Sequence, residues 1–120
     1  MTFTQAISAG FSNYINFSGR ASRSAFWYWM LFAFLIGIVA DIIDYGVGSG
    51  SGVIGELWGL ATLLPNLAIG ARRLHDTDRS GFWLFLILLP LIGLIVLIVW
   101  WCLKGTSGSN QYGPDSVPAS

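Results

Sequence analysis

The sequence contains few charged residues, and this scarcity is its first constraint. Lys, Arg, Asp and Glu make up 10% of the 120 residues, against roughly 25% in an average soluble domain. Hydrophobic residues reach 54%, a composition that points to a lipid environment, and the length suits one domain. The six basic and six acidic residues cancel. No excess positive charge is available for nucleic acid, so a nucleic-acid partner is not expected.

Cysteine and histidine each occur once, as Cys102 and His75. A single cysteine excludes an intramolecular disulfide, and Cys102 lies in an apolar run where a reactive thiolate is costly. His75 stands near Asp76 and Asp78, but none of the common zinc-ligand spacings is present. We therefore predict no metal ion and no cofactor.

Three long apolar runs make up most of the chain. The longest, residues 82–103, has 22 residues without a charge. A helix rises about 1.5 Å per residue, so this run is long enough to cross a hydrocarbon core of about 30 Å. All three runs are continuously apolar, whereas the strands of a membrane barrel alternate. The predicted fold class is all-α, an integral membrane three-helix bundle with spans near 25–43, 53–71 and 82–103.

The middle run is the least regular, because it contains Glu56, Pro65 and Asn66. Residues 53–71 therefore predict a tilted or kinked span, or else a re-entrant segment. Ionisable groups inside a span usually face a bundle interior or water, which makes Glu56 and Asn66 a candidate intramembrane polar site. The alternatives are that Glu56 reaches the headgroups from near the helix end, and that the Asn66 amide serves a helix contact.

The positions of the arginines predict the orientation. Two precede the first run and three lie between the second and the third: Arg20, Arg23, Arg72, Arg73 and Arg79. The connection 41–55 contains no Lys or Arg. Since basic residues near span ends tend to remain in the cytoplasm, we predict a cytoplasmic N-terminus and arginine loop, with the acidic connection and the C-terminal tail outside. Lys104 is the one basic residue that opposes this arrangement.

We treat residues 1–120 as a single membrane domain, with a cytoplasmic segment 1–24, a transmembrane region 25–103 and a tail 104–120. In the first segment, apolar residues recur at spacings of three and four, as expected for a short amphipathic helix: Phe3, Ala6, Ile7, Phe11, Tyr14 and Ile15. Such a helix lies in the headgroup layer or packs on the bundle. The tail is rich in turn-forming residues.

The connection between the first two runs is acidic and glycine-rich. Asp41, Asp44 and Glu56 gather three carboxylates there without a basic partner, and such a group can bind a cation. Residues 46–52 alternate glycine with valine or serine, a composition typical of a flexible connector.

The segment 72–81 concentrates five charges and the histidine beside the membrane. If the second helix continues inward, Asp76 lies four residues after Arg72 and three before Arg79, spacings at which side chains pair. One interpretation is a topology signal whose arginines are partly neutralised. The others are a protein-docking surface or a site for the phosphate of an anionic lipid or lipid-linked substrate. The candidate contact residues are Arg20, Arg23, Arg72, Arg73, His75, Asp76 and Arg79.

His75, Asp76 and Ser80 are the side-chain types of a nucleophilic triad. A triad is defined by geometry, however, and so local a cluster rarely provides it. We predict no catalytic residues and no enzymatic activity.

Three stretches together resemble a known bacterial family. They are Gly-Arg-Ala-Ser-Arg-Ser at 19–24 leading into Phe26 and Trp27, Arg-Arg-Leu-His-Asp-Thr at 72–77 followed by Arg-Ser-Gly at 79–81, and Gly105 and Thr106 through Asn110 to Tyr-Gly-Pro-Asp at 112–115. The chain resembles the YhaH-type inner membrane proteins of the domain of unknown function 805 family. This implies a bacterial inner membrane location and no reaction. Asp78 departs from the pattern, which often has glycine there, and puts a glycine-dependent turn in doubt.

The leading functional hypothesis is a small multi-pass, non-enzymatic membrane module that binds lipid phosphates or a membrane partner, including a second copy of itself. The alternative is a subunit of a small oligomeric channel or transporter in which Glu56 and Asn66 line a shared pathway. Three short spans enclose little volume, which argues against transport by a single chain.

Overall fold

The computed structural model describes residues 2–46 and 52–114. Its elements are all helical: α1 (Phe3–Ser12), α2 (Arg23–Gly46), α3 (Val53–Asp76), the 3₁₀ helix η1 (Gly81–Leu88) and α4 (Ile92–Cys102). This confirms the all-α class. Most of the predicted connector, 47–51, and the last residues of the tail, 115–120, lie outside the described residues.

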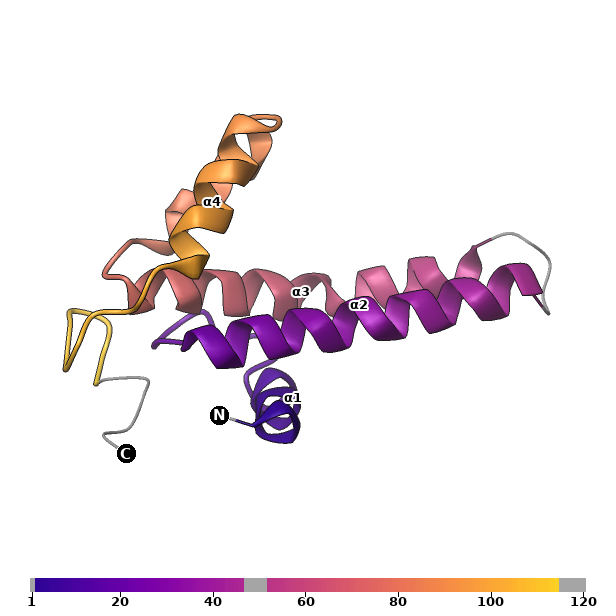
Figure 1. The fold of residues 1–120 in the computed structure, drawn as a ribbon, viewed down its shortest axis with the longest axis horizontal. Coiled ribbons are helices and arrows are strands. Elements are labelled where there is room, and N and C mark those ends of the chain that lie inside the picture. Colours follow the sequence, from indigo (N-terminus) through magenta and orange to yellow (C-terminus); the bar gives the residue numbers. More distant parts are fainter. Residues whose placement is uncertain (1, 47–51, 115–120) are drawn as a thin grey trace.

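Helices α2 and α3 form a long antiparallel pair (Figure 1). Each has 24 residues and is apolar enough to cross a membrane, and a helix of that length extends about 36 Å. Indole groups join the two helices along their length. Trp29 Nε1 donates to Asn66 Oδ1 at 2.8 Å, and Trp58 Nε1 donates to the Ala33 carbonyl at 2.9 Å. The first two predicted spans are therefore helices, and the middle run is a continuous helix despite Pro65.

An aspartate closes the acidic end of this pair. The two carboxylate oxygens of Asp44, a buried residue at the end of α2, accept from Ile54 N at 3.0 Å and from Gly55 N at 2.9 Å. These amides belong to the first turn of α3, which lacks a side-chain cap of its own because Gly52 precedes it. Asp44 therefore acts as a helix cap. Its carboxylate is committed to the backbone, which leaves less of the acidic group for a cation.

The prediction of one continuous third span is wrong. Residues 81–102 instead fold as η1 and α4, which run back along each other as a hairpin that projects away from the α2–α3 pair (Figure 1). Pro90 lacks an amide proton and cannot continue a helix, and Leu91 reverses the chain with a φ of 65°. Gly93 then lies against the Leu86 carbonyl, where a Cβ would overlap it. Neither short helix has the length of a span.

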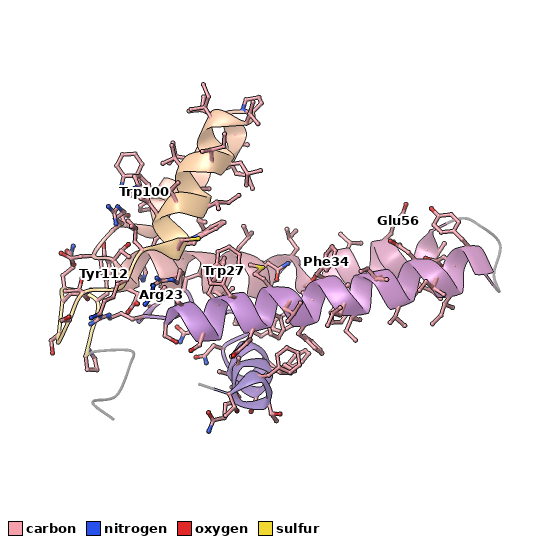
Figure 2. All side chains as sticks on the ribbon, viewed as in Figure 1. Arg23, Trp27, Phe34, Glu56, Trp100 and Tyr112 are labelled. Atoms are coloured by element: carbon pink, nitrogen blue, oxygen red, sulfur yellow. The ribbon has the colours of Figure 1, made fainter. Side chains whose placement is uncertain are left out.

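This hairpin places the C-terminal tail at the arginine end, and so corrects the predicted position of the tail outside. Thr106 N donates to the Asp76 carbonyl at 2.7 Å, at the last residue of α3. In Figure 2, Arg23 and Tyr112 lie at one end of the helix pair and Glu56 lies at the other. Lys104 now falls on the same side as the arginines and no longer opposes the charge rule.

Helix α1 packs against α2, as one of the two predictions for it requires. Its start is fixed by a capping box between Thr2 and Gln5. Gly10 meets the Trp29 ring so closely that a Cβ would overlap the indole, and the Phe11 ring contacts the same indole edge-on at 5.1 Å between centroids. The glycine that weakens this helix in isolation is what lets it approach α2.

The buried apolar core is small, and large apolar side chains cover most of the outside. One buried cluster consists of Ala21, Ala25, Phe26, Trp29 and Ile69. Along α2 and α3, by contrast, residues such as Phe34, Leu57 and Leu60 are more than half exposed. An apolar surface this extensive is what a bilayer requires of its contact face, and it would drive aggregation in water.

We expect residues that precede and residues that follow the transmembrane region in the sequence to be labelled from the same face of the membrane. In a Cys102→Ser background, Ser18→Cys and Ser109→Cys should react together with a membrane-impermeant maleimide, whereas Tyr45→Cys should react from the opposite side. Intact cells and inverted vesicles supply the two sides. Labelling of Ser18→Cys and Ser109→Cys from opposite sides would restore a third crossing and contradict the hairpin.

Candidate functional site

The three motif stretches that are far apart in the sequence meet at the arginine end. Ala21 N donates to the Arg72 carbonyl at 3.0 Å, which ties the segment before α2 to the last turn of α3. The tail joins them, since Asn110 Nδ2 donates to the His75 carbonyl at 2.9 Å. Asp78 adopts a φ of 62° in the turn that follows α3. The turn therefore forms without glycine, in a conformation that aspartate tolerates better than most residues.

Asp76 lies at the centre of this junction between two arginines. Its Oδ1 is 2.9 Å from Arg20 Nε, and its Oδ2 is 2.7 Å from Arg73 Nη1. All three side chains are almost completely buried. The sequence spacing suggested Arg72 or Arg79 as the partner, and this expectation is wrong. Arg73 precedes Asp76 by three residues on the same helix, and Arg20 comes from a distant segment.

The remaining donors of Arg20 bind backbone carbonyls of the tail, and those of Arg73 bind carbonyls at the end of α4. Arg20 donates through Nη1 to the Gly108 carbonyl at 2.6 Å and through Nη2 to the Thr106 carbonyl. Arg73 donates through Nε to the Trp101 carbonyl at 3.0 Å and through Nη2 to the Leu103 carbonyl. Planar guanidinium groups can serve several acceptors at once. Arg20 and Arg73 therefore have structural contacts that bind the tail to the helix pair.

Arg72 is different, because its guanidinium has no hydrogen-bond acceptor in the part of the chain that the structure describes. The residue is 6% exposed, and its Nε and Nη2 are fully enclosed without a hydrogen bond. Nη1 likewise has no acceptor in residues 2–46 and 52–114, but this nitrogen is not fully enclosed. On the helix, Arg72 shares a face with the buried residues Ala68 and Pro65. A buried cation without a partner is costly, so Arg72 is the arginine of this end whose charge the fold leaves uncompensated.

Arg23 and Arg79 lie nearer the solvent. Arg23 is exposed, and its Nη1 is 3.5 Å from the Cys102 carbonyl at the end of α4. The Arg79 guanidinium carbon stands 4.7 Å above the Trp100 ring in a cation–π contact. Neither side chain forms an ion pair with a carboxylate of the described residues. Both therefore add positive charge to this end.

His75 is stacked on Tyr112, with 4.0 Å between the ring centroids and 5° between the planes. Its Nδ1 lies 2.9 Å from the Gly19 carbonyl, which can only accept, so Nδ1 carries the proton. In a nucleophilic triad, His75 Nδ1 would donate to the Asp76 carboxylate. That carboxylate instead accepts from Arg20 and Arg73. In the part of the chain that the structure describes, no three His, Cys, Asp or Glu residues are grouped to hold a metal ion.

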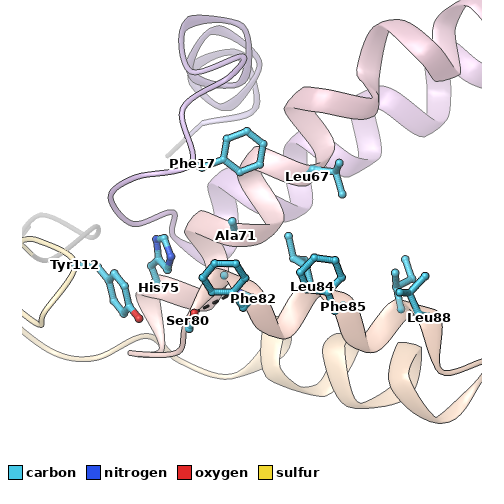
Figure 3. Close-up of a pocket in the computed structure, with 12 residues that line it drawn as sticks. Phe17, Leu67, Ala71, His75, Ser80, Phe82, Leu84, Phe85, Leu88 and Tyr112 are labelled. Atoms are coloured by element: carbon cyan, nitrogen blue, oxygen red, sulfur yellow. Dashed lines mark hydrogen bonds between the residues drawn. The ribbon is translucent and has the colours of Figure 1, made fainter.

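An apolar pocket of about 640 Å³ lies beside His75, between α3 and η1 (Figure 3). Its floor includes Leu67 and Ala71 of α3, and its wall includes Phe82 and Phe85 of η1. The sequence did not predict this pocket, because the hydropathy of 82–103 predicts one continuous span and not a first third that folds back beside α3. Pro90 was the available signal for a break.

Glu56 and Asn66 do not come together. Glu56 is exposed in the first turn of α3, and Asn66 lies ten residues later, about 15 Å along the helix axis. The Asn66 oxygen is occupied by the Trp29 indole. Of the two interpretations of this amide, the helix contact is the one that the geometry supports.

We expect Asp76→Asn to destabilise the protein strongly. The change leaves Arg20 and Arg73 as buried cations without their carboxylate, and breaking a buried ion pair typically costs about 3 to 5 kcal/mol. Thermal unfolding in detergent measures the loss, and limited proteolysis should show the tail released. Asp78→Asn is the matched control, since Asp78 is exposed in the same turn. Equal melting temperatures for the two variants would contradict the central role of Asp76.

Comparisons with known proteins agree with the motifs. The family model described as "Protein of unknown function (DUF805)" matches residues 14–114. The inner membrane protein YhaI of Escherichia coli K12 is 48% identical over 103 residues, which cover 86% of this chain and 87% of that protein. The inner membrane protein YhaH of the same organism is 40% identical over 107 residues, covering 86% and 88%.

A more distant relative, the uncharacterized protein YiiR of Escherichia coli K12, is 28% identical over 132 aligned positions that cover 84% of this chain and 86% of that protein. No solved structure matches the chain. The family model covers most of the chain, and two relatives exceed 30% identity over most of its length. The chain therefore belongs to the DUF805 family and is a multi-pass membrane protein, similar to relatives of the bacterial inner membrane.

Proposed function

We propose that this protein is a non-enzymatic membrane module that binds the phosphate of an anionic lipid at its arginine end. The observation that carries the proposal is the buried guanidinium of Arg72, for which the described residues supply neither a carboxylate nor a backbone acceptor. An anion supplied by the membrane can reach this group through Nη1, the guanidinium nitrogen that is not fully enclosed. Neither the family description nor the names of the relatives state an activity, and the proposal assigns none.

The position of Arg72 suits a lipid headgroup. The residue lies in the last turn and a half of α3, and a helix of about 36 Å that crosses a core of about 30 Å reaches the headgroup layer at its ends. A phosphate in that layer lies at the right depth. Arginine pairs with phosphate through short, charge-assisted hydrogen bonds.

The distribution of charge over the molecule supports an anionic ligand at this end. All six basic residues lie in the segments that meet there, including the exposed Arg23 and Lys104. Glu56 lies at the opposite end (Figure 2), and Asp44 and Asp41 lie beside it, against Ile54 and Gly55 at the start of α3. Within the junction, Asp76 neutralises part of the charge of Arg20 and Arg73 but makes no contact with Arg72. The cytoplasmic leaflet, where the arginines are predicted to lie, attracts such basic groups through its anionic lipids.

Replacing Arg72 with glutamine should remove the preference for anionic lipid. Hydrogen bonds to charged groups contribute about 1.5 to 3 kcal/mol, and 1.4 kcal/mol corresponds to a factor of ten. We therefore expect Arg72→Gln to lower the retention of phosphatidylglycerol relative to phosphatidylethanolamine by about tenfold or more. Native mass spectrometry of protein released from mixed micelles measures this ratio.

Lys104→Gln is the matched control, because it removes one positive charge from an exposed site at the same end. Its lipid preference should stay close to that of the unmodified protein. Arg72→Gln should also keep its melting temperature without anionic lipid, since the change removes a charge that has no partner. An unchanged phosphatidylglycerol preference in folded Arg72→Gln protein would remove the proposal, and capture of a membrane protein instead of lipid would favour a docking role.

A further inference from the structure

The pocket beside His75 has one polar end and a long apolar side. At the polar end it is bounded by His75, Ser80 and Tyr112, all at the arginine end of the molecule (Figure 3). From there its lining follows η1 through Phe85 to Leu88, away from that end. Phe85 is 66% exposed and Leu88 is similarly open, so the pocket faces the region that lipid occupies.

Two polar groups at this end have unused hydrogen-bonding capacity. His75 is 8% exposed, and its Nε2 lies 3.4 Å from the position that a Cβ on Gly81 would take, which directs it at the pocket lining. With Nδ1 bound to the Gly19 carbonyl, a neutral ring leaves Nε2 as an acceptor. The Ser80 hydroxyl accepts from Phe82 N and keeps its own proton to donate. The pocket thus offers one acceptor and one donor above an apolar cavity.

We propose that this pocket holds one acyl chain of a membrane phospholipid, with the ester and glycerol region of that lipid at His75 and Ser80. The inference goes beyond the phosphate site at Arg72, because the pocket recognises a hydrocarbon chain whatever the charge of the headgroup. Ala71 lines the pocket, whereas Arg72 lies about 100° further around the helix. The two groups therefore serve separate lipid contacts.

The dimensions of the pocket favour an acyl chain over a segment of protein as its occupant. A volume of about 640 Å³ is typical of pockets for small molecules, which range over about 300 to 1,000 Å³. A helix with its side chains is about 10 Å wide and rises about 5.4 Å per turn. The pocket would thus enclose little more than one turn of a helix from a second copy, too little to hold it. A slender acyl chain, already abundant around the exposed faces of η1, fits the elongated apolar lining.

The test uses the full chain in micelles with a phosphatidylcholine that carries a photoreactive diazirine on one acyl chain. After illumination, crosslinks should concentrate on Leu67 and on the segment 82–88. Leu67→Trp fills the pocket from a partly exposed position, and it should lower this crosslinking by tenfold or more. Leu60→Trp is the matched control, because Leu60 is 69% exposed on the same helix and lies outside the pocket. It should leave the yield unchanged.

Leu88→Trp provides a second obstruction from an exposed position, in case Leu67→Trp disturbs the fold, and it should act in the same direction. Arg72→Gln should leave the crosslinking of this zwitterionic lipid unchanged, so failure of the phosphate site and failure of the acyl site give different results. Crosslinks spread evenly over Phe34 and Ile38 of α2 would show an ordinary lipid layer and overturn the proposal. Crosslinking that is undiminished in both Leu67→Trp and Leu88→Trp would also overturn the proposal. So would protein–protein crosslinks at 82–88.

Discussion

A single buried carboxylate determines how the chain closes at its arginine end. Asp76 accepts from Arg20 and Arg73, and the two guanidinium groups also donate to backbone carbonyls of the tail and of the end of α4. Each partner is a group that would be costly to bury alone. Because the carboxylate and the two guanidinium groups bind one another, three segments that are distant in the sequence can pack together at this end. Gly105 belongs to the same arrangement, because a Cβ there would overlap Asp76.

This junction divides the arginines into two kinds. Arg20 and Arg73 spend their donors on Asp76 and on backbone carbonyls, so their charge is used to hold the fold. Arg72, between Arg73 and the pocket-lining Ala71 in the sequence, is also buried but has no acceptor among the described residues. A buried charge without a partner lowers the stability of the fold unless a bound ligand of opposite charge offsets the loss of hydration. Arg72 and Arg73 are adjacent residues of one helix turn, yet only Arg73 has acceptors in the described part of the chain. This contrast distinguishes a structural arginine from a candidate binding arginine, which the number of arginines cannot do.

The sequence predicted the helical class, the first two spans and the gathering of positive charge, because these follow from long apolar runs and from arginine positions that act locally. It did not predict the partners of Asp76. The spacing pointed to Arg72 and Arg79, whereas Arg20 lies 56 residues away and is brought near only by tertiary packing. Hydropathy also missed the break in the third run, since both halves are equally apolar. Pro90 and Gly93 carried the only local signal, and the close approach of Gly93 to Leu86 becomes visible only in the folded chain.

The broken third run has consequences for the whole topology. Irregular backbone at membrane depth is tolerated where protein or a water-filled cavity shields it, and here η1 and α4 pack on each other and on α3 through Gly70, against which Leu84 and Trp101 lie. The two long apolar helices and the hairpin return the chain to the arginine end, where Arg73 donates to carbonyls at the end of α4 and Arg20 donates to carbonyls of the tail. A third full crossing would leave those donors without acceptors and would remove the wall of the pocket. The hairpin, the tail and the Asp76 junction therefore depend on one another.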